Sequence, residues 1–163
     1  MTDFHQLRRT PGEGPFPREV GPNEVSARRA LARCRVTMLP ATTAAVASNE
    51  VNKGDVLATA RVAGIQAAKQ AASLIPLAHP VLIGNVHLNF VIAESSIEIE
   101  ASVDTIDRTG VEMEAMTAAT VAALTIYDMC KSIDRTMTIE GIALWEKSGG
   151  RSGSWRRLDD GDS

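Results

Sequence analysis

The segment VEMEAMTAATVAALTIYDMCK, residues 111–131, constrains the fold of this chain more than any other. It is predicted to be a long helix, with acidic residues in its first turn and with Asp128 and Lys131 near its end. Its middle, residues 115–127, is apolar or threonine almost all round, whereas a sheet can cover only one side of a helix. We therefore expect this helix to be buried on two sides, by its own sheet and by a second copy of the chain.

The charged ends of this helix cannot meet within one chain. At a rise of about 1.5 Å per residue, Glu114 and Asp128 lie about 21 Å apart along the axis, on nearly the same face. Two such helices packed antiparallel would place the head of one beside the tail of the other. The simplest expectation is an oligomer in which neighbouring protomers share composite sites.

The two ends of the helix differ in how readily helix stability explains their charges. Glu112 and Glu114 complement the positive pole of a helix N-terminus, and Lys131 complements the negative pole at the C-terminus. Asp128 lies near the unfavourable pole, at a cost that Lys131 can offset because it lies on the same face. Asp128 with Lys131 is therefore the better candidate for chemistry.

Alternation of apolar and polar residues predicts the strands of one sheet. The alternating segments are residues 33–39, 85–92, 97–103 and 136–147. In the last of these the apolar phase shifts at Gly141, which indicates a β-bulge.

Residues 55–74 are predicted to form the first long helix, with Asp55 as its N-cap. The order of elements, β-α-β-β-α-β, is that of a ferredoxin-like α+β fold, in which an antiparallel sheet carries both long helices on one face. One stripe of this first helix holds small or apolar residues that would let another backbone approach closely: Leu57, Ala60, Gly64, Ala67 and Ala71.

The length of 163 residues suits a single domain with a core. Residues 1–25 are rich in proline and glycine and are predicted to be a flexible or clamped N-terminal arm. Residues 26–153 are predicted to form the domain, and residues 154–163 a charged C-terminal tail.

Composition argues against several classes of function. A net charge of −3 gives no global basic field, so neither nucleic acid nor a membrane surface is an expected partner. Phe90 is the sole aromatic residue of the paired strands 86–92 and 97–103, and its phase points inward, unlike the stacking aromatics of an RNA-binding sheet. With no signal peptide and no segment long enough to span a bilayer, the expected location is the cytoplasm. Neither the cysteines nor the histidines show metal-binding spacing, so no structural metal is expected.

Two further residues are candidates for ligand binding, each with an ordinary alternative. Lys53 precedes a glycine and a helix N-cap, where it can contact phosphate, or it is a solvated loop lysine. His79 lies in a stiff segment between Pro76 and Pro80, where it can bind a ligand or act as an acid or base, or it is a structural histidine. Basic residues including Lys53 suit a polyanionic ligand, while acidic residues and His79 can handle protons.

Four ordered blocks of the sequence carry a resemblance to a known family. They are KGDVLATARVAGIQAAK, LIPLAHP, TGVEMEAMTAATVAALTIYDMCK and EKSGGRSG. From about Arg28 to Gly153 the chain resembles the MoaC family, enzymes of molybdenum cofactor biosynthesis. The resemblance implies that residues 26–153 are a catalytic domain and that the ferredoxin-like protomers form a homohexamer, a trimer of dimers with sites at the dimer interfaces.

The implied reaction converts a cyclised dihydro-GTP intermediate into cyclic pyranopterin monophosphate and pyrophosphate. No resident cofactor is implied, and a divalent ion can accompany the triphosphate. By position, Asp128 matches the family's active-site aspartate, and Lys53 and Lys131 match its catalytic lysines. We expect either a lysine with a lowered pKa or Asp128 to move protons. The substrate-binding residues implied by the resemblance are Leu77, Ala78, His79, Met113, Glu114, Glu112, Arg28 and Lys147.

The chain departs from the usual family pattern at several positions. Ala78 stands where the family usually has cysteine, so a side-chain role is lost there. Asp107 replaces a common loop glycine, Arg151 replaces a common lysine, and PREV replaces MVDV at residues 17–20. None of these changes removes a charged residue of the implied pocket.

The alternative reading is a non-catalytic ferredoxin-like module that binds a small ligand or another protein. It explains the sheet and the oligomer equally well. It does not explain why Asp128, Lys131 and Lys53 occur together.

Overall fold

The computed structural model describes residues 23–159. Most of the N-terminal arm expected over residues 1–25 lies outside this range, as do residues 160–163 of the C-terminal tail. The elements are β1 (Ser26–Thr37), α1 (Pro40–Ala47), α2 (Val56–Leu74), β2 (Ile83–Ile92), β3 (Ser96–Asp107), α3 (Glu112–Cys130), β4 (Thr138–Ser148) and β5 (Trp155–Arg156).

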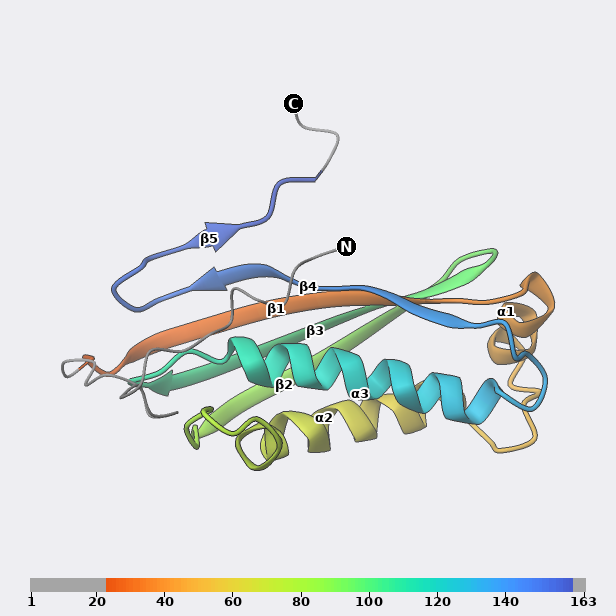
Figure 1. The fold of residues 1–163 in the computed structure, drawn as a ribbon, viewed down its shortest axis with the longest axis horizontal. Coiled ribbons are helices and arrows are strands. Elements are labelled where there is room, and N and C mark those ends of the chain that lie inside the picture. Colours follow the sequence, from red (N-terminus) through yellow and green to blue (C-terminus); the bar gives the residue numbers. More distant parts are fainter. Residues whose placement is uncertain (1–22, 160–163) are drawn as a thin grey trace, which may run out of the picture.

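One antiparallel sheet carries both long helices on the same face (Figure 1). The strand order is β2-β3-β1-β4-β5, and every pair of neighbours is antiparallel. The helices α2 and α3 lie side by side and run in opposite directions, so that the start of α2 lies near the end of α3 (Figure 1). The predicted ferredoxin-like α+β fold is confirmed.

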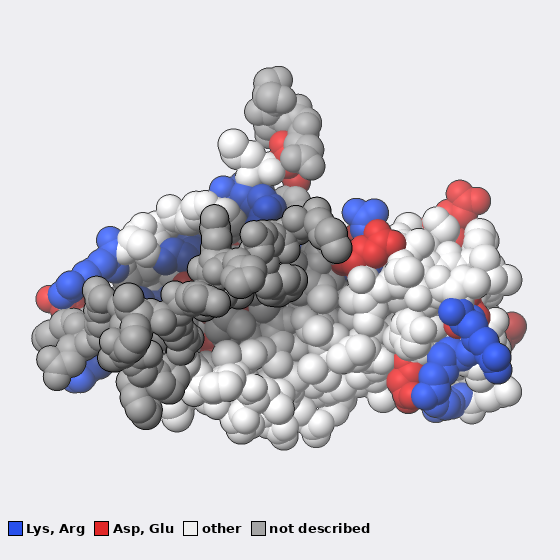
Figure 2. Space-filling model, in the orientation of Figure 1, with Lys and Arg blue, Asp and Glu red and all other residues white. Residues whose placement is uncertain are grey.

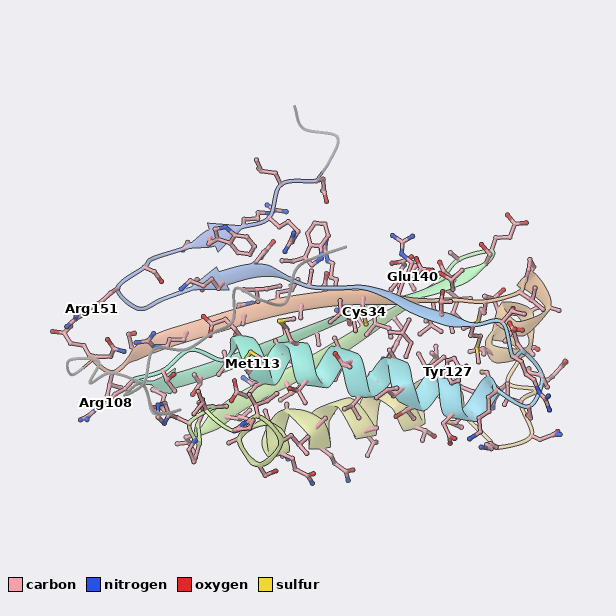
Figure 3. All side chains as sticks on the ribbon, viewed as in Figure 1. Cys34, Arg108, Met113, Tyr127, Glu140 and Arg151 are labelled. Carbon is pink, nitrogen blue, oxygen red and sulfur yellow. The ribbon has the colours of Figure 1, made fainter. Side chains whose placement is uncertain are left out.

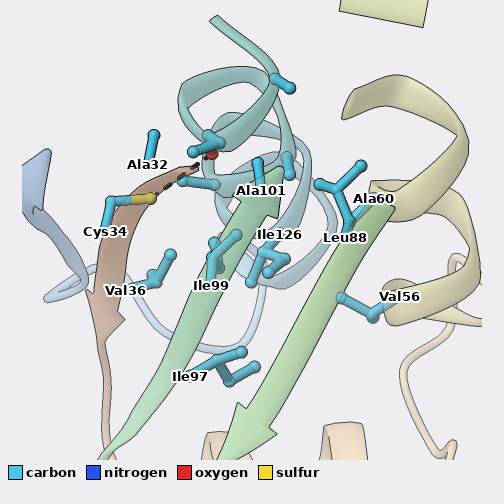
Figure 4. Close-up of a cluster of buried hydrophobic side chains, with 14 of the residues drawn as sticks. Ala32, Cys34, Val36, Val56, Ala60, Leu88, Ile97, Ile99, Ala101 and Ile126 are labelled. Carbon is cyan, nitrogen blue, oxygen red and sulfur yellow. Dashed lines mark hydrogen bonds between the residues drawn. The ribbon is translucent and has the colours of Figure 1, made fainter. Parts of the chain in front are cut away.

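The core lies between the sheet and the two long helices, and its strand residues are those that the alternation indicates. In β1 the side chains of Cys34 and Val36 are buried, and in β3 those of Ile97 and Ile99 are at most 1% exposed. They pack with residues of α2 and α3 in one hydrophobic cluster, part of which is drawn in Figure 4. The inward phase predicted for β1 and β3 is therefore confirmed.

Small residues on α2 allow the two long helices to approach closely. Ala60, Gly64, Ala67 and Ala71 are buried, as the predicted stripe requires. A Cβ atom added at Gly64 would lie 3.0 Å from the carbonyl oxygen of Ala118 in α3 and 2.5 Å from a methyl carbon of Leu88. A side chain at this position would therefore push α2 away from α3 and the sheet.

The predicted bulge in β4 is confirmed, and a second irregularity accompanies it. Gly141 has φ +63, and the register between β1 and β4 shifts where it lies, between the partners of Arg33 and Arg35. A second shift falls between the partners of Leu31 and Ala32. The sequence pattern did not indicate this second shift.

The structure contains more strand residues than the sequence predicted, near both ends of the described chain. β1 begins at Ser26, well before the predicted start at Arg33. Residues 30–32 are all apolar, so they show no alternation in the sequence. All three are buried in the structure, including Leu31 at 7% exposure. At the other end, β5 forms within the expected tail, and its Trp155 pairs with Lys147 of β4.

The exposed surface of α3 is largely apolar. Leu124 is 52% exposed on this face, and Val62 of the neighbouring α2 is 56% exposed. Figure 2 shows uncharged side chains across the middle of the helical layer and a group of basic and acidic side chains toward the end of α3. Within the part of the chain that the structure describes, no helix is both long enough and apolar enough to cross a membrane.

Candidate active site

The last turn of α3 meets the loop before α2 in a group of charged side chains, here called the lysine–aspartate cluster (Lys53, Asp128 and Lys131). The Nζ atom of Lys131 lies 2.7 Å from Oδ1 of Asp128. The Nζ atom of Lys53 lies 3.4 Å from Oδ2 and donates a hydrogen bond of 3.0 Å to the backbone carbonyl of Asp128. Both lysines thus contact Asp128, the carboxylate at the helix end that disfavours a negative charge.

Local structure explains how Lys53 reaches Asp128. Gly54 has φ +108, a backbone conformation that favours glycine, and it turns the chain into α2. Asp55 then caps α2 as predicted, because its carboxylate accepts the N–H of Ala58 at 3.0 Å. Lys53 therefore contacts Asp128 while its side chain stays 45% exposed, so both of its possible roles, ligand binding and that of a loop lysine, remain predictions.

The two lysines keep the carboxylate of Asp128 ionised. Hydrogen bonds from Lys131 and Lys53 hold the pKa of Asp128 below its ordinary value. The same contact with Asp128 raises the pKa of Lys131. The expectation of a lysine with a lowered pKa is therefore wrong for Lys131, which is a cation at neutral pH. The cluster as a whole has one more positive charge than negative, and all of its side chains are exposed to an incoming anion.

A second group of charged residues comes from the first turn of α3 and from the strands β1 and β4, and is here called the N-terminal cluster (Arg28, Glu112, Glu114 and Lys147). The Nζ atom of Lys147 in β4 lies 3.8 Å from Oε1 of Glu112. Arg28 in β1 donates a hydrogen bond of 3.0 Å to the backbone carbonyl of Asp107. Glu114 is only 4% exposed, and burial raises its pKa. This end of α3 therefore holds a carboxyl group that gives up its proton less readily than an exposed glutamate does.

The glycine loop after β4 packs on the N-terminal cluster. Gly150 has φ +78, and a side chain there would run into the guanidinium group of Arg28. Arg28, Gly150 and Arg151 line an open groove of about 370 Å³ together with Glu24 and Ser26. Arg28 of β1, Lys147 of β4 and Arg151 of the glycine loop thus lie at one end of the molecule.

The predicted substrate-binding loop lies at the same end as the N-terminal cluster (Figure 1). Leu77 and His79 are exposed in the segment that joins α2 to β2, and Ala78 is half-buried. The segment is tied to the end of β3, because Oδ2 of Asp107 accepts the N–H of Leu82 at 3.2 Å. Met113, in the first turn of α3 at the same end of the molecule, is 38% exposed.

The structure thus divides the predicted site residues between the two ends of α3. Figure 3 marks these ends with Met113 in the first turn and Tyr127, next to Asp128, in the last. Glu114 and Asp128 lie in one continuous helix, so a rise of about 1.5 Å per residue separates them by about 21 Å along its axis. One chain gathers the predicted catalytic residues at one end and the predicted substrate-binding residues at the other.

Sequence reasoning missed a buried carboxylate beside the lysine–aspartate cluster. Asp134 follows α3 and is 2% exposed. Its only sequence signal is an acidic residue in a short connection between a helix and a strand. No three His, Cys, Asp or Glu side chains in residues 23–159 gather closely enough to hold a metal ion.

The sequence model of the MoaC family matches residues 18–150. The chain belongs to the MoaC family. The resemblance of the four sequence blocks is therefore confirmed, and the match covers both clusters.

Three relatives illustrate how similar this MoaC chain is to proteins of known name. The cyclic pyranopterin monophosphate synthase of Thermomicrobium roseum is 57% identical over 135 residues, which is 82% of this chain and 81% of the relative. That of Chloroflexus aggregans is 55% identical over 141 residues, 85% of this chain and 86% of the relative. The cyclic pyranopterin monophosphate synthase 3 of Mycobacterium bovis is 52% identical over 142 residues, 86% of this chain and 80% of the relative.

Proposed function

We propose that this protein is a cyclic pyranopterin monophosphate synthase of molybdenum cofactor biosynthesis. It converts a cyclised dihydro-GTP intermediate into cyclic pyranopterin monophosphate and releases pyrophosphate. Membership of the MoaC family and the names of its relatives support this reaction. The observation that carries it to particular residues is the lysine–aspartate cluster, in which two cations surround one ionised carboxylate.

The lysines of this cluster act on the triphosphate. Lys53 and Lys131 are cationic points that can bind phosphate oxygens and stabilise the negative charge that develops as pyrophosphate departs. Their exposure leaves them open to a substrate, and their contacts with Asp128 hold them in place beforehand. Their role is electrostatic.

Proton transfer falls to the carboxyl groups. Asp128 stays ionised because its pKa is lowered, so it can accept a proton during ring opening. Glu114 has a raised pKa and can donate one. The remaining residues of the N-terminal cluster, with Leu77, Ala78, His79 and Met113, bind the rest of the nucleotide.

Because these residues lie at opposite ends of α3, one site that contains all of them needs two copies of the chain. We place two α3 helices antiparallel across their exposed apolar faces, where Leu124 is 52% exposed. Each lysine–aspartate cluster then lies beside the N-terminal cluster of the other copy. Three such dimers form the homohexamer that the family resemblance implies.

The proposed enzyme works in the cytoplasm, and its partners are the nucleotide substrate and further copies of itself, with no role for nucleic acid or a membrane. It uses no resident cofactor or metal site. A divalent ion that binds the triphosphate in solution can enter with the substrate.

The test is to incubate the purified protein with the cyclised dihydro-GTP intermediate and to follow pyrophosphate and the pterin product. We expect both products from the wild-type chain, and neither from Asp128→Ala or Lys131→Ala. Full turnover by either variant with intact assembly would refute the assigned roles. Binding without turnover by the correctly assembled wild-type protein would favour the non-catalytic module.

A further inference from the structure

Asp134 is a buried carboxylate that the proposed chemistry does not use. It accepts hydrogen bonds from the N–H of Leu39 at 2.8 Å and from the hydroxyl of Thr42 at 2.9 Å. It also accepts the N–H of Thr136 at 2.9 Å and its hydroxyl at 2.7 Å. Burial alone would raise the pKa of Asp134, but these hydrogen bonds outweigh it and lower the pKa to about 2. The group is therefore a permanent anion at physiological pH.

On one side, Asp134 is connected to Lys131 by a short and well-bonded turn. The N–H of Asp134 donates to the carbonyl of Cys130 at 3.1 Å, and the N–H of Lys131 donates to the carbonyl of Tyr127 at 2.9 Å. Lys131 and Asp134, which follow α3, are thus both hydrogen-bonded to its last turn. Displacing the carboxylate of Asp134 would loosen the chain that carries Lys131.

On the other side, Asp134 holds the start of α1. Leu39 is the N-cap residue of α1 and has no side chain that can accept a hydrogen bond from the helix. The carboxylate of Asp134 supplies an acceptor there through Leu39 and Thr42. It therefore fixes where α1 sits against the end of α3.

A hydrogen-bonded segment connects α1 to Lys53. The N–H of Glu50 donates to the carbonyl of Ala45 at 2.9 Å and closes the end of α1. Val51 is then buried at 6% exposure, and its carbonyl accepts the N–H of Gly54 at 3.0 Å. Lys53 lies within this last turn, so its position follows that of α1.

These contacts connect α3, α1 and Lys53 in a ring that begins and ends at α3. Asp134 joins the end of α3 to α1, α1 leads to Lys53, and Lys53 returns to the carbonyl and carboxylate of Asp128 in α3. We infer that Asp134 is a positioning residue, whose buried carboxylate sets Lys53 and Lys131 around Asp128. As a role in the reaction, this inference rests on the proposed function. Its geometric content does not.

The experiment measures the pKa of the Asp128 carboxyl by carbon NMR titration, with the signal assigned by comparison with Asp128→Asn. In Asp134→Asn we expect this pKa to rise toward the ordinary value, because the lysines that lower it are less firmly held. We also expect kcat/KM to fall by roughly tenfold to a hundredfold, as a small misplacement of catalytic groups would produce. Leu88→Ala is the control for a general loss of stability, because it leaves a cavity at a buried position in the middle of β2. It should leave the pKa of Asp128 unchanged.

A matched pair of variants decides the matter if Asp134→Asn does not fold. Thr42→Val and Thr136→Val each remove one hydroxyl that donates to Asp134, but only Thr42 lies on the path to Lys53. We expect Thr42→Val to raise the Asp128 pKa and lower kcat/KM more than Thr136→Val does. Equal effects of the two, or a folded Asp134→Asn with an unchanged Asp128 pKa, would overturn the inference. The titration needs no substrate. An inactive wild-type protein would therefore refute the proposed function, while the titration would still decide whether Asp134 positions the lysines.

Discussion

The two ends of α3 carry carboxyl groups in opposite environments. Asp128, in the last turn, is exposed to solvent, and the hydrogen bonds from Lys131 and Lys53 lower its pKa. Glu114, in the first turn, is 4% exposed, and burial raises its pKa although it lies at the helix pole that favours a negative charge. The local surroundings therefore outweigh the helix dipole at both ends.

This difference suggests how an acid and a base can be obtained from one helix. Where two carboxyl groups have pKa values shifted apart, one is available as a base and the other as an acid. Asp128 and Glu114 have such shifts but lie too far apart within one chain to act together. Asp128 and Glu114 can therefore act in one reaction only if a second copy brings opposite ends of α3 into one site.

The largest expected effect is on the reaction itself. Asp128→Ala or Lys131→Ala should lower turnover by roughly a hundredfold to ten-thousandfold, because the base or the cation that stabilises the leaving group is lost. The melting temperature should barely change, because exposed ion pairs contribute little to stability. Pyrophosphate release and thermal denaturation measure the two quantities.

Lys69→Ala serves as the control for these variants, since Lys69 is an exposed lysine of α2. It should retain wild-type turnover. A loss of activity as large as that of Lys131→Ala would mean that general surface charge, and not the lysine–aspartate cluster, supports the reaction.

The next effect concerns assembly. Leu124→Lys introduces a charge on the exposed apolar face of α3, where it costs the single chain little but would be buried between two helices. We expect smaller particles in light scattering and at least a tenfold loss of turnover. Arg61→Ala in α2 is a comparison in which a surface residue changes without placing a charge on α3. An active monomeric Leu124→Lys protein would contradict the composite site.

A third test asks directly whether opposite ends of α3 cooperate between copies. Asp128→Ala and Glu114→Ala should each be inactive alone, but a co-expressed mixture should regain about a quarter of wild-type turnover. Random pairing makes half of the dimers mixed, and each mixed dimer contains one intact site out of two. If each chain used only its own residues, the mixture would remain inactive.

The sequence predicted best what depends on local periodicity. The phases of β1 and β3, the N-cap at Asp55 and the bulge at Gly141 all follow from neighbouring residues, and the structure confirms them. β5 was missed because two residues have no period, and because the strand exists only through its pairing with β4. Such pairing is a property of the folded sheet.

The site shows the same limit. The ion pair of Asp128 and Lys131 could be predicted, because the residues share one helix face. The family resemblance implied that Lys53 and Asp128 are both catalytic, but the sequence did not predict their contact within one chain, since the two residues lie far apart in it. Asp134 was missed entirely, because its donors come from a helix start and a strand approach that the sequence does not place near each other.

The smallest expected effect is on the pH dependence of stability at the buried end. The pKa of Glu114 in the folded chain is raised above its ordinary value of 4.5, so its contribution to stability is complete below that pH and is lost as the pH rises through the folded pKa. In the dispersed Leu124→Lys background, Glu114→Gln should therefore raise the melting temperature by a few degrees at about pH 7 and leave it unchanged at about pH 4. In the assembled protein, the lysine–aspartate cluster of a second copy would cover Glu114 and raise its pKa further by burial, so the same substitution should then raise the melting temperature at neutral pH by more. Identical responses in the two backgrounds would show that no lysine–aspartate cluster reaches Glu114, and the two ends of α3 would have to be treated as separate features.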